Sequence, residues 1–197
     1  NDNGGTLRIT TAAVTGNRHG IYARNRYSGN LAVDSTLGTV SGTLALGSGI
    51  YARERSAGYL SLTTAAVSAG IGINARNYDG GLLSIDSTLG LVTGTSYGGI
   101  DAQDAGTGDL TITTASVTGI TGGISATNNG NGALTIDSTL GTVTATGGSA
   151  NAITATDNGT GGIEITSAAA TGGQFGIGAR NFGGGNLTID SLAGTLT

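Results

Sequence analysis

The chain has 197 residues, of which 39 are glycine, and it contains no proline, cysteine, methionine or tryptophan. Only 10% of the residues are charged and 4% are aromatic, which argues against a compact globule with one central core. The absence of cysteine excludes disulfide frameworks and thiolate metal sites, and a net charge of -4 argues against nucleic acid as a partner.

A triplet of the form Leu-x-Ile recurs along the chain and defines a repeating unit. It reads LRI at position 7, LAV at 31, LSL at 60, LSI at 83, LTI at 110, LTI at 134, IEI at 163 and LTI at 187, in steps of 23 to 29 residues. Shorter units such as LTITTASVTG alternate with longer units that contain the segment DSTLG. Such recurrence is the signature of a solenoid or another repeat architecture.

Each unit predicts three short strands. In the first unit these are Leu7–Ile9, the pair Val14–Thr15 and Ile21–Ala23, where apolar and polar residues alternate. The Gly, Asn, Asp and Ser clusters between them indicate turns too short for crossover helices, so each strand must pair with its equivalent in the next unit. We therefore expect an all-β fold, a right-handed parallel β-helix of about eight rungs of 23–29 residues. We expect residues 1–197 to form one such solenoid, which is a segment of a longer repeat array.

The third strand carries the most regular motif, GIYARN at residues 20–25, which returns as GIYARE, GINARN and GIGARN. Alternation points Ile21 and Ala23 inward, and Gly20 permits a bend before the strand. The residue after the strand is predicted to form a structural ladder whose side chains bond turn backbone. Its members are Asn25, Glu54, Asn77, Asp104, Asn128, Asp157 and Asn181.

The same strands place a column of arginine and tyrosine on the outside of the coil. Tyr22, Arg24, Tyr51, Arg53 and Arg76 are candidate binding residues, because Arg and Tyr together suit sugars and acidic groups. The alternative is a solvated outer face on which arginine stems cover the sheet. Residues 1–79 carry seven arginines and four acids, a net charge of +3, and residues 80–197 carry one arginine and eight acids, a net charge of -7.

Catalysis is not predicted. His19 is the one histidine, and it lies in a turn without a marked carboxylate partner. Asp34, Asp86, Asp137 and Asp190 follow the triplet in every longer unit, about 9.6 Å apart by strand spacing, which is the outer limit for an inverting pair of carboxylates. Because this arrangement repeats along the rod, we expect these acids to cap turn backbone.

Two further binding hypotheses arise from the sequence. Asp101, Asp104 and Asp109 would hold one Ca²⁺ if their oxygens converged, but solvated turn acids are the preferred interpretation, so neither a metal nor a cofactor is expected. Thr111 and Thr113 fit a flat hydroxyl face of the ice-binding type, whereas Arg8 and Glu164 at equivalent positions interrupt it.

The repeat pattern GIYARN…GNLAVDSTLGTVSGT resembles the passenger-domain repeats of bacterial autotransporters. The resemblance implies secretion, a β-helical stalk at the cell surface, and adhesion. We therefore expect a structural or adhesive segment of an extracellular repeat protein. Its expected partners are further copies of the chain, stacked end to end in filaments, or cell-surface glycans. We do not expect this segment to insert into a membrane. The alternatives are a polysaccharide-binding or polysaccharide-cleaving β-helix and an ice-binding β-helix.

Overall fold

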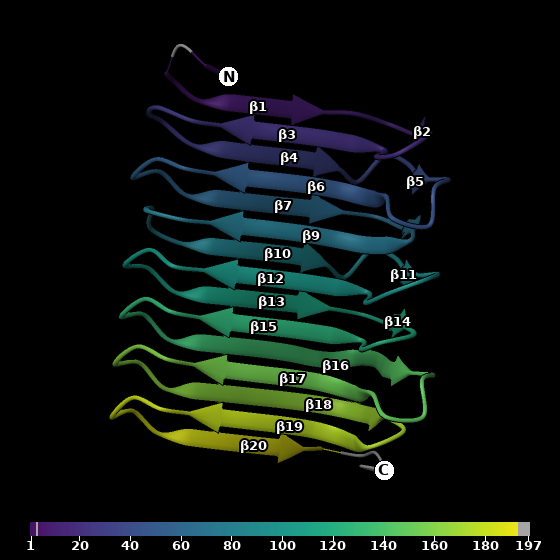
Figure 1. Cartoon of the computed structure of the whole chain (residues 1–197), viewed down its shortest axis with the longest axis vertical. Coiled ribbons are helices and arrows are strands. Elements are labelled where there is room, and N and C mark those ends of the chain that lie inside the picture. The colour runs from purple at the N-terminus through teal and green to yellow at the C-terminus, as the bar shows by residue number, and fades with distance from the viewer. Residues whose placement is uncertain (3, 193–197) are drawn as a thin grey trace.

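A computed structural model of the chain describes residues 1–2 and 4–192 as an all-β parallel solenoid of about seven turns (Figure 1). Rungs follow one another in chain order, from β1 at one end of the rod to β20 at the other. Within the described ranges there is no helix, and hence none long and apolar enough to cross a membrane. The predicted fold class is confirmed, with three strands per rung.

The strands fall into three positions of the rung. The first position comprises β1 (Leu7–Thr10), β4 (Leu31–Ser35), β7 (Leu60–Thr64), β10 (Leu83–Ser87), β13 (Leu110–Thr114), β16 (Leu134–Ala145), β18 (Ile163–Thr171) and β20 (Leu187–Ser191). The second comprises β2 (Val14–Gly16), β5 (Val40–Gly42), β8 (Val67–Ala69), β11 (Val92–Gly94) and β14 (Val117–Gly119). The third comprises β3 (Ile21–Asn25), β6 (Ser48–Glu54), β9 (Ile71–Asn77), β12 (Ile100–Asp104), β15 (Ile124–Asn128), β17 (Asn151–Asp157) and β19 (Phe175–Asn181).

Every strand pairs in parallel with its equivalent on the neighbouring rung. The third strands form a seven-stranded sheet, and the first and second strands form a thirteen-stranded sheet joined through β16, which spans both positions. Ile21 pairs with Ile50, and Ile50 pairs with Ile73, so equivalent residues lie in single file. This stacking is what the recurring triplets and hexapeptides predict.

The core is a thin column of stacked aliphatic side chains. Leu31, Leu60, Ile50 and Ile73 are fully buried, and their equivalents continue the column to Ile163 and Ile165. Leu7 and Ile9 of β1 are partly buried, because β1 has a paired neighbour on one side. Burial of these side chains supplies the main stabilising term of a rod that has no larger core.

A column of glycines lies at the start of the third strands, and its role differs from the predicted bend. Among the described residues, positive φ angles occur at Gly4, Gly5 and Gly29, so Gly20 needs no special backbone conformation. A Cβ at Gly20 would instead lie 2.6 Å from Val40 Cγ1 on the next rung and 2.8 Å from the carbonyl oxygen of Gly49. Glycine is required here because the rungs approach closely.

A buried hydroxyl column, which the sequence analysis did not predict, ends the first strands. Its members are fully buried: Ser35, Thr64, Ser87, Thr114, Ser138 and Ser167. Ser87 Oγ donates to Thr114 Oγ1 at 2.8 Å, and Ser138 Oγ donates to Ser167 Oγ at 3.0 Å. These bonds between rungs satisfy polar groups that would otherwise be costly to bury.

Candidate functional site

The third strands of the first rungs build the most chemically varied surface of the rod. Their register places Tyr22 beside Tyr51 and Arg24 beside Arg53, and then Arg53 beside Arg76. We call His19, Tyr22, Arg24, Tyr51 and Arg53, together with Asn74 and Arg76, the arginine–tyrosine face. The structure brings the five predicted binding residues together on this face. On the later rungs, the position of Arg24, Arg53 and Arg76 is occupied by Gln103, Thr127, Thr156 and Arg180.

Aromatic rings stack at the centre of this face. The rings of Tyr22 and Tyr51 are parallel, with an interplanar angle of 1° and centroids 5.1 Å apart. The His19 ring lies 5.5 Å from the Tyr22 ring and 5.2 Å from the Tyr51 ring. Tyr22 is 54% exposed, so a flat aromatic surface is presented to solvent.

Arginine side chains extend the stack. The guanidinium carbon of Arg53 lies 4.8 Å from the centroid of the Tyr51 ring, within the range of a cation–π contact. Arg55, which directly follows β6 on the same rung, lies 5.1 Å from the ring of Tyr78 on the next rung. Arg24 Nη1 donates to the Tyr22 hydroxyl at 3.2 Å, which links the two outward columns of β3.

A hollow of about 280 Å³ lies beside these rings, and His19, Tyr22, Tyr51, Leu46 and Asn74 contribute to its walls. Asn74 Oδ1 is buried and has no hydrogen-bond partner among the described residues. A buried acceptor of this kind is usually satisfied by a protein group or by water. Asn74 therefore leaves an unsatisfied acceptor in the wall of the hollow.

The environment of His19 favours its neutral form. Burial and the neighbouring Arg18 charge hold the pKa of His19 below its ordinary value. Its Nδ1 accepts a hydrogen bond from the Ser48 backbone N–H at 3.1 Å, so the neutral ring carries its proton on Nε2. His19 is thus positioned as a hydrogen-bond donor, and no carboxylate of the described residues orients it as a catalytic base.

The arginines of the column differ in their partners. Arg76 makes a bidentate pair with Asp101 of the next rung, with Nη1 to Oδ1 at 2.9 Å and Nη2 to Oδ2 at 2.5 Å. For Arg24 and Arg53, no carboxylate within the described part of the chain lies within 4.0 Å. The charge of Arg76 is therefore balanced by Asp101, whereas the charges of Arg24 and Arg53 are not balanced by a carboxylate of the described residues.

The predicted ladder lies on the inner side of the same strands, behind the arginine–tyrosine face. Asn77 Nδ2 donates to the Gly81 carbonyl at 2.7 Å, and Asn128 Nδ2 donates to the Gly132 carbonyl at 2.5 Å. The acids accept instead, and Asp157 Oδ1 receives the Gly159 N–H at 3.0 Å. The ladder members Asn25, Glu54, Asn77, Asp104, Asn128 and Asp157 are all buried, and Asn181 is half-buried. These bonds hold the turns that lead into the next rung.

Asp104 is the most perturbed member of the ladder. Burial, opposed by hydrogen bonds from the Gly106 and Ala105 backbone, raises the pKa of Asp104 to about 6. Oδ1 accepts from Gly106 at 3.1 Å, whereas Oδ2 is buried without a partner among the described residues. The carboxyl group is therefore easier to protonate in the folded rod than in an unfolded chain.

The acids of the longer units cap their own turns. The backbone N–H and the hydroxyl of Thr88 both donate to Asp86 Oδ1, at 3.0 and 2.8 Å, and Asp137 accepts the same pair of bonds from Thr139. In Asp34 the equivalent bonds from Thr36 lower the pKa of the carboxyl group. Asp190 occupies the same position, opposite Thr166. Three of the four carboxylates are thus engaged in local structure.

The acids considered for Ca²⁺ do not converge. Asp101 faces outward and pairs with Arg76, whereas Asp104 of the same strand is buried. Across the described ranges, no three His, Cys, Asp or Glu side chains gather in a way that could hold a metal ion.

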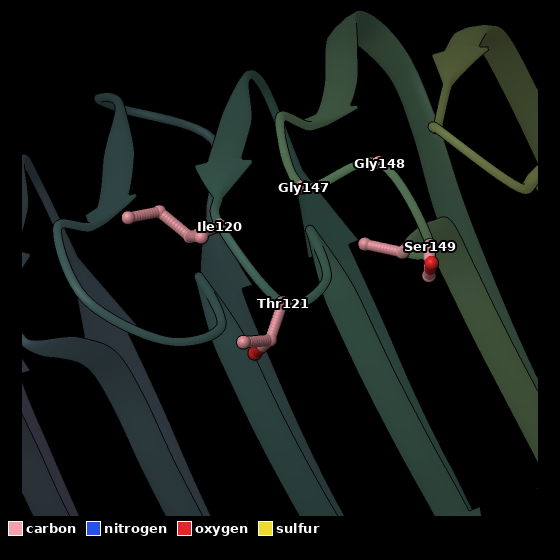
Figure 2. Close-up of a pocket in the computed structure, with 6 residues that line it drawn as sticks. Ile120, Thr121, Gly147, Gly148 and Ser149 are labelled. Atoms are coloured by element: carbon pink, nitrogen blue, oxygen red, sulfur yellow. The ribbon is translucent and has the colours of Figure 1, made fainter.

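Another hollow, of about 260 Å³, lies between two turns further along the rod. Figure 2 shows Ile120 and Thr121, in the turn before β15, beside Gly147, Gly148 and Ser149 in the turn before β17. The two glycines leave space that a side chain would fill. Because its walls carry no charged group, this hollow offers little chemistry beyond apolar contact.

The second strands carry an outward hydroxyl column that the sequence analysis did not single out. It comprises Thr15, Ser41, Ser68, Thr93, Thr118 and Thr144. On the first strands, outward threonines alternate with Asp34, Asp86 and Asp137. A second hydroxyl column, Ser61, Ser84, Thr111 and Thr135, is interrupted by Glu164 on the next rung. Hydroxyl columns interrupted by charged groups do not make the continuous flat lattice that ice binding uses.

Comparison with known proteins finds no matching protein family, no matching curated protein and no matching solved structure. The function of the chain is therefore argued from its own surface. The arginine–tyrosine face is the strongest candidate. It combines stacked rings with Arg24 and Arg53, which have no carboxylate partner among the described residues, and with an acceptor of Asn74 that has no partner there either.

Proposed function

We propose that this chain is a structural and adhesive segment of a secreted or cell-surface repeat protein, in which the arginine–tyrosine face binds glycans. The solenoid supplies a stiff rod whose length follows from the number of rungs. The observation that carries the proposal is the parallel Tyr22–Tyr51 stack beside the hollow lined by His19 and Asn74.

The chemistry of this face suits a saccharide. A sugar ring has an apolar face that packs on a flat aromatic ring, and hydroxyl groups that need both donors and acceptors. Here Tyr22 offers the exposed ring, Asn74 Oδ1 offers an acceptor, and the neutral His19 offers a donor.

The extracellular location rests on the resemblance of the repeat segment GNLAVDSTLGTVSGT to autotransporter passenger repeats. A parallel solenoid is compatible with that resemblance. The polysaccharide-cleaving alternative is less favoured, because the outward acids Asp34, Asp86 and Asp137 are engaged in turn caps.

Saccharide titrations followed by NMR test the proposal. We expect at least one neutral or acidic oligosaccharide to bind the full chain, and Tyr22→Ala to weaken that binding about tenfold through loss of the stacking surface. Tyr59→Ala is the matched control, because Tyr59 is also exposed, at 42%, and lies outside the face. Failure of every saccharide to bind, or equal losses in the two variants, would refute the glycan function. Cleavage products in the same samples would favour the enzyme instead.

A further inference from the structure

Arg24 and Arg53 form a pair of adjacent cations with no counter-charge among the described residues. They are register partners on β3 and β6, two strands about 4.8 Å apart. Each has a buried Nε without a hydrogen-bond partner in the described part of the chain. Guanidinium groups on two adjacent strands repel each other unless an anion lies between or beside them.

The carboxylates near this pair are occupied elsewhere. Glu54 follows Arg53 directly, but its side chain is buried on the inner side of the strand, where Oε1 accepts bonds from the Ser56 N–H and hydroxyl. Asp101 is held by Arg76. The third arginine of the column is thus neutralised within the rod, and the first two are not.

Both guanidinium groups are held in place by tyrosines. Arg24 Nη1 is bonded to the Tyr22 hydroxyl, and the Arg53 guanidinium lies over the Tyr51 ring. This arrangement limits the freedom of the two side chains before any ligand arrives. Preorganised planar guanidinium groups favour oxygen anions that accept two bonds in one plane, such as carboxylates, sulfates and phosphates.

We propose that Arg24 and Arg53 together bind one oxyanion, and that this oxyanion is the sulfate ester or carboxylate of an acidic saccharide whose ring packs against Tyr22. The oxyanion bridges rungs one and two, and the adjoining hollow of about 280 Å³ holds the rest of the sugar. The saccharide part of this inference rests on the proposed function, whereas the oxyanion site stands on the arginine pair alone.

The same charges limit the length of the ligand. Residues 80–197 carry one arginine and eight acids, and the outward column continues after Arg76 with Gln103 and Thr127. A long polyanion lying along the rod would meet this acidic part and be repelled. The site therefore selects one or a few acidic groups at the first rungs.

Calorimetric titration of the full chain at low salt tests the inference with four ligands. These are sodium sulfate alone, a neutral oligosaccharide, and the same oligosaccharide carrying either a sulfate ester or a uronic carboxylate. The double variant Arg24→Gln/Arg53→Gln removes the pair. Arg180→Gln is the matched control, because Arg180 lies in the same column without a second arginine beside it.

We expect sulfate and the acidic oligosaccharides to bind the wild type, and the double variant to bind them about tenfold or more weakly. The control and the affinity for the neutral oligosaccharide are expected to change less than about twofold. Arg24→Lys/Arg53→Lys, which keeps the charge but not the planar fork, is expected to recover only part of the affinity.

The outcomes separate this inference from the proposed function. Sulfate binding that depends on the pair, without binding of any saccharide, keeps the oxyanion site and refutes the glycan function. Binding of the neutral sugar together with an unchanged preference for acidic sugars in the double variant refutes the oxyanion site and keeps the glycan function. Equal losses in Arg180→Gln also overturn the inference. Matching far-ultraviolet circular dichroism and melting temperatures establish that each variant is folded.

Discussion

Gly99 lies directly against Val117 of the following rung, and a Cβ atom at position 99 would overlap the Cγ1 methyl of that valine. The same relationship joins Gly20 to Val40, and it recurs at Gly49, Gly72 and Gly123. In the sixth rung the glycine position is Ala152, and at the valine position of the next rung stands Ala170. A smaller side chain at the valine position of one rung thus accompanies an added methyl at the glycine position of its neighbour.

Gly99→Ala is expected to destabilise the rod by about 1–3 kcal/mol, because an added methyl overpacks the contact with Val117. Val117→Ala removes part of a fully buried side chain and costs stability by itself, but it should cost less in the Gly99→Ala background, as the Ala152 and Ala170 pair indicates. The nearby carbonyl oxygens of Gly123 and Thr118 keep this compensation incomplete. Chemical denaturation measures both. Gly148→Ala is the control, since no atom lies within 4 Å of its added Cβ. A double variant no more stable than expected from adding the two single effects would contradict this packing.

Asp104 makes the stability of the rod depend on pH. Its pKa of about 6 in the folded rod lies above the ordinary value of 3.8, so the folded state binds this proton more tightly than the unfolded chain. The stabilising contribution is complete below about pH 4 and is lost as the pH rises through about 6. His19 acts in the opposite sense, because its pKa is lowered and its protonation as the pH falls costs stability.

Asp104→Asn isolates the contribution of this carboxyl group. The ladder already uses asparagine at Asn77 and Asn128, where Nδ2 donates to a carbonyl four residues later, so the amide introduced at position 104 would find the Gly108 carbonyl in the same place. At pH 8 the variant is expected to be more stable than the wild type by about 1–3 kcal/mol, and the difference should shrink toward pH 4. Thermal unfolding across this pH range measures it, with exposed Asp79→Asn as the control. A difference that does not vary with pH would show that Asp104 does not titrate in this window.

Ile73→Ala tests the stacked core. Ile73 is fully buried between Ile50 and Ile100, so the truncation should cost about 2–5 kcal/mol. Leu37→Ala removes a side chain of similar size that is 77% exposed, and it should change stability by less than about 0.5 kcal/mol. Denaturant titration compares the two. Similar losses in both variants would mean that Leu37 is buried in solution, and hence that the outer surface is covered.

Asp86→Ala tests the role of the acids in the longer units. The substitution removes two hydrogen bonds from Thr88 at the corner of the fourth rung, and we expect a loss of about 1 kcal/mol. Affinity for saccharides should not change, because Asp86 lies on another sheet from the arginine–tyrosine face. A loss of glycan binding with unchanged stability would instead place the binding site on the first strands.

The architecture could be predicted from the sequence because each rung repeats the same constraints. The Leu-x-Ile triplets and the GIYARN hexapeptides set strand positions, and turns this short leave pairing with the next rung as the only solution. The Tyr22, Tyr51, Arg24 and Arg53 columns follow from the same register.

Other features depend on contacts between rungs that one unit does not reveal. Glycine is required at position 20 because Val40 of the next rung lies so close, and not because the backbone bends there. This short distance depends on how the corners of successive rungs overlap. Asn74 and the position of His19 in the site were missed, because their importance arises from neighbours on other rungs. The pairing of Arg76 with Asp101 was missed in the same way, although both columns were visible in the sequence.

The central claim is that ligand recognition is confined to the arginine–tyrosine face, while the rest of the rod serves as a scaffold. Backbone NMR shifts recorded while a sulfated oligosaccharide is added to the full chain test this claim most directly. The account predicts changes confined to residues 18–24, 46–55 and 71–78. Changes centred on the Asp86 and Asp137 column, or spread evenly along the rod, would contradict it.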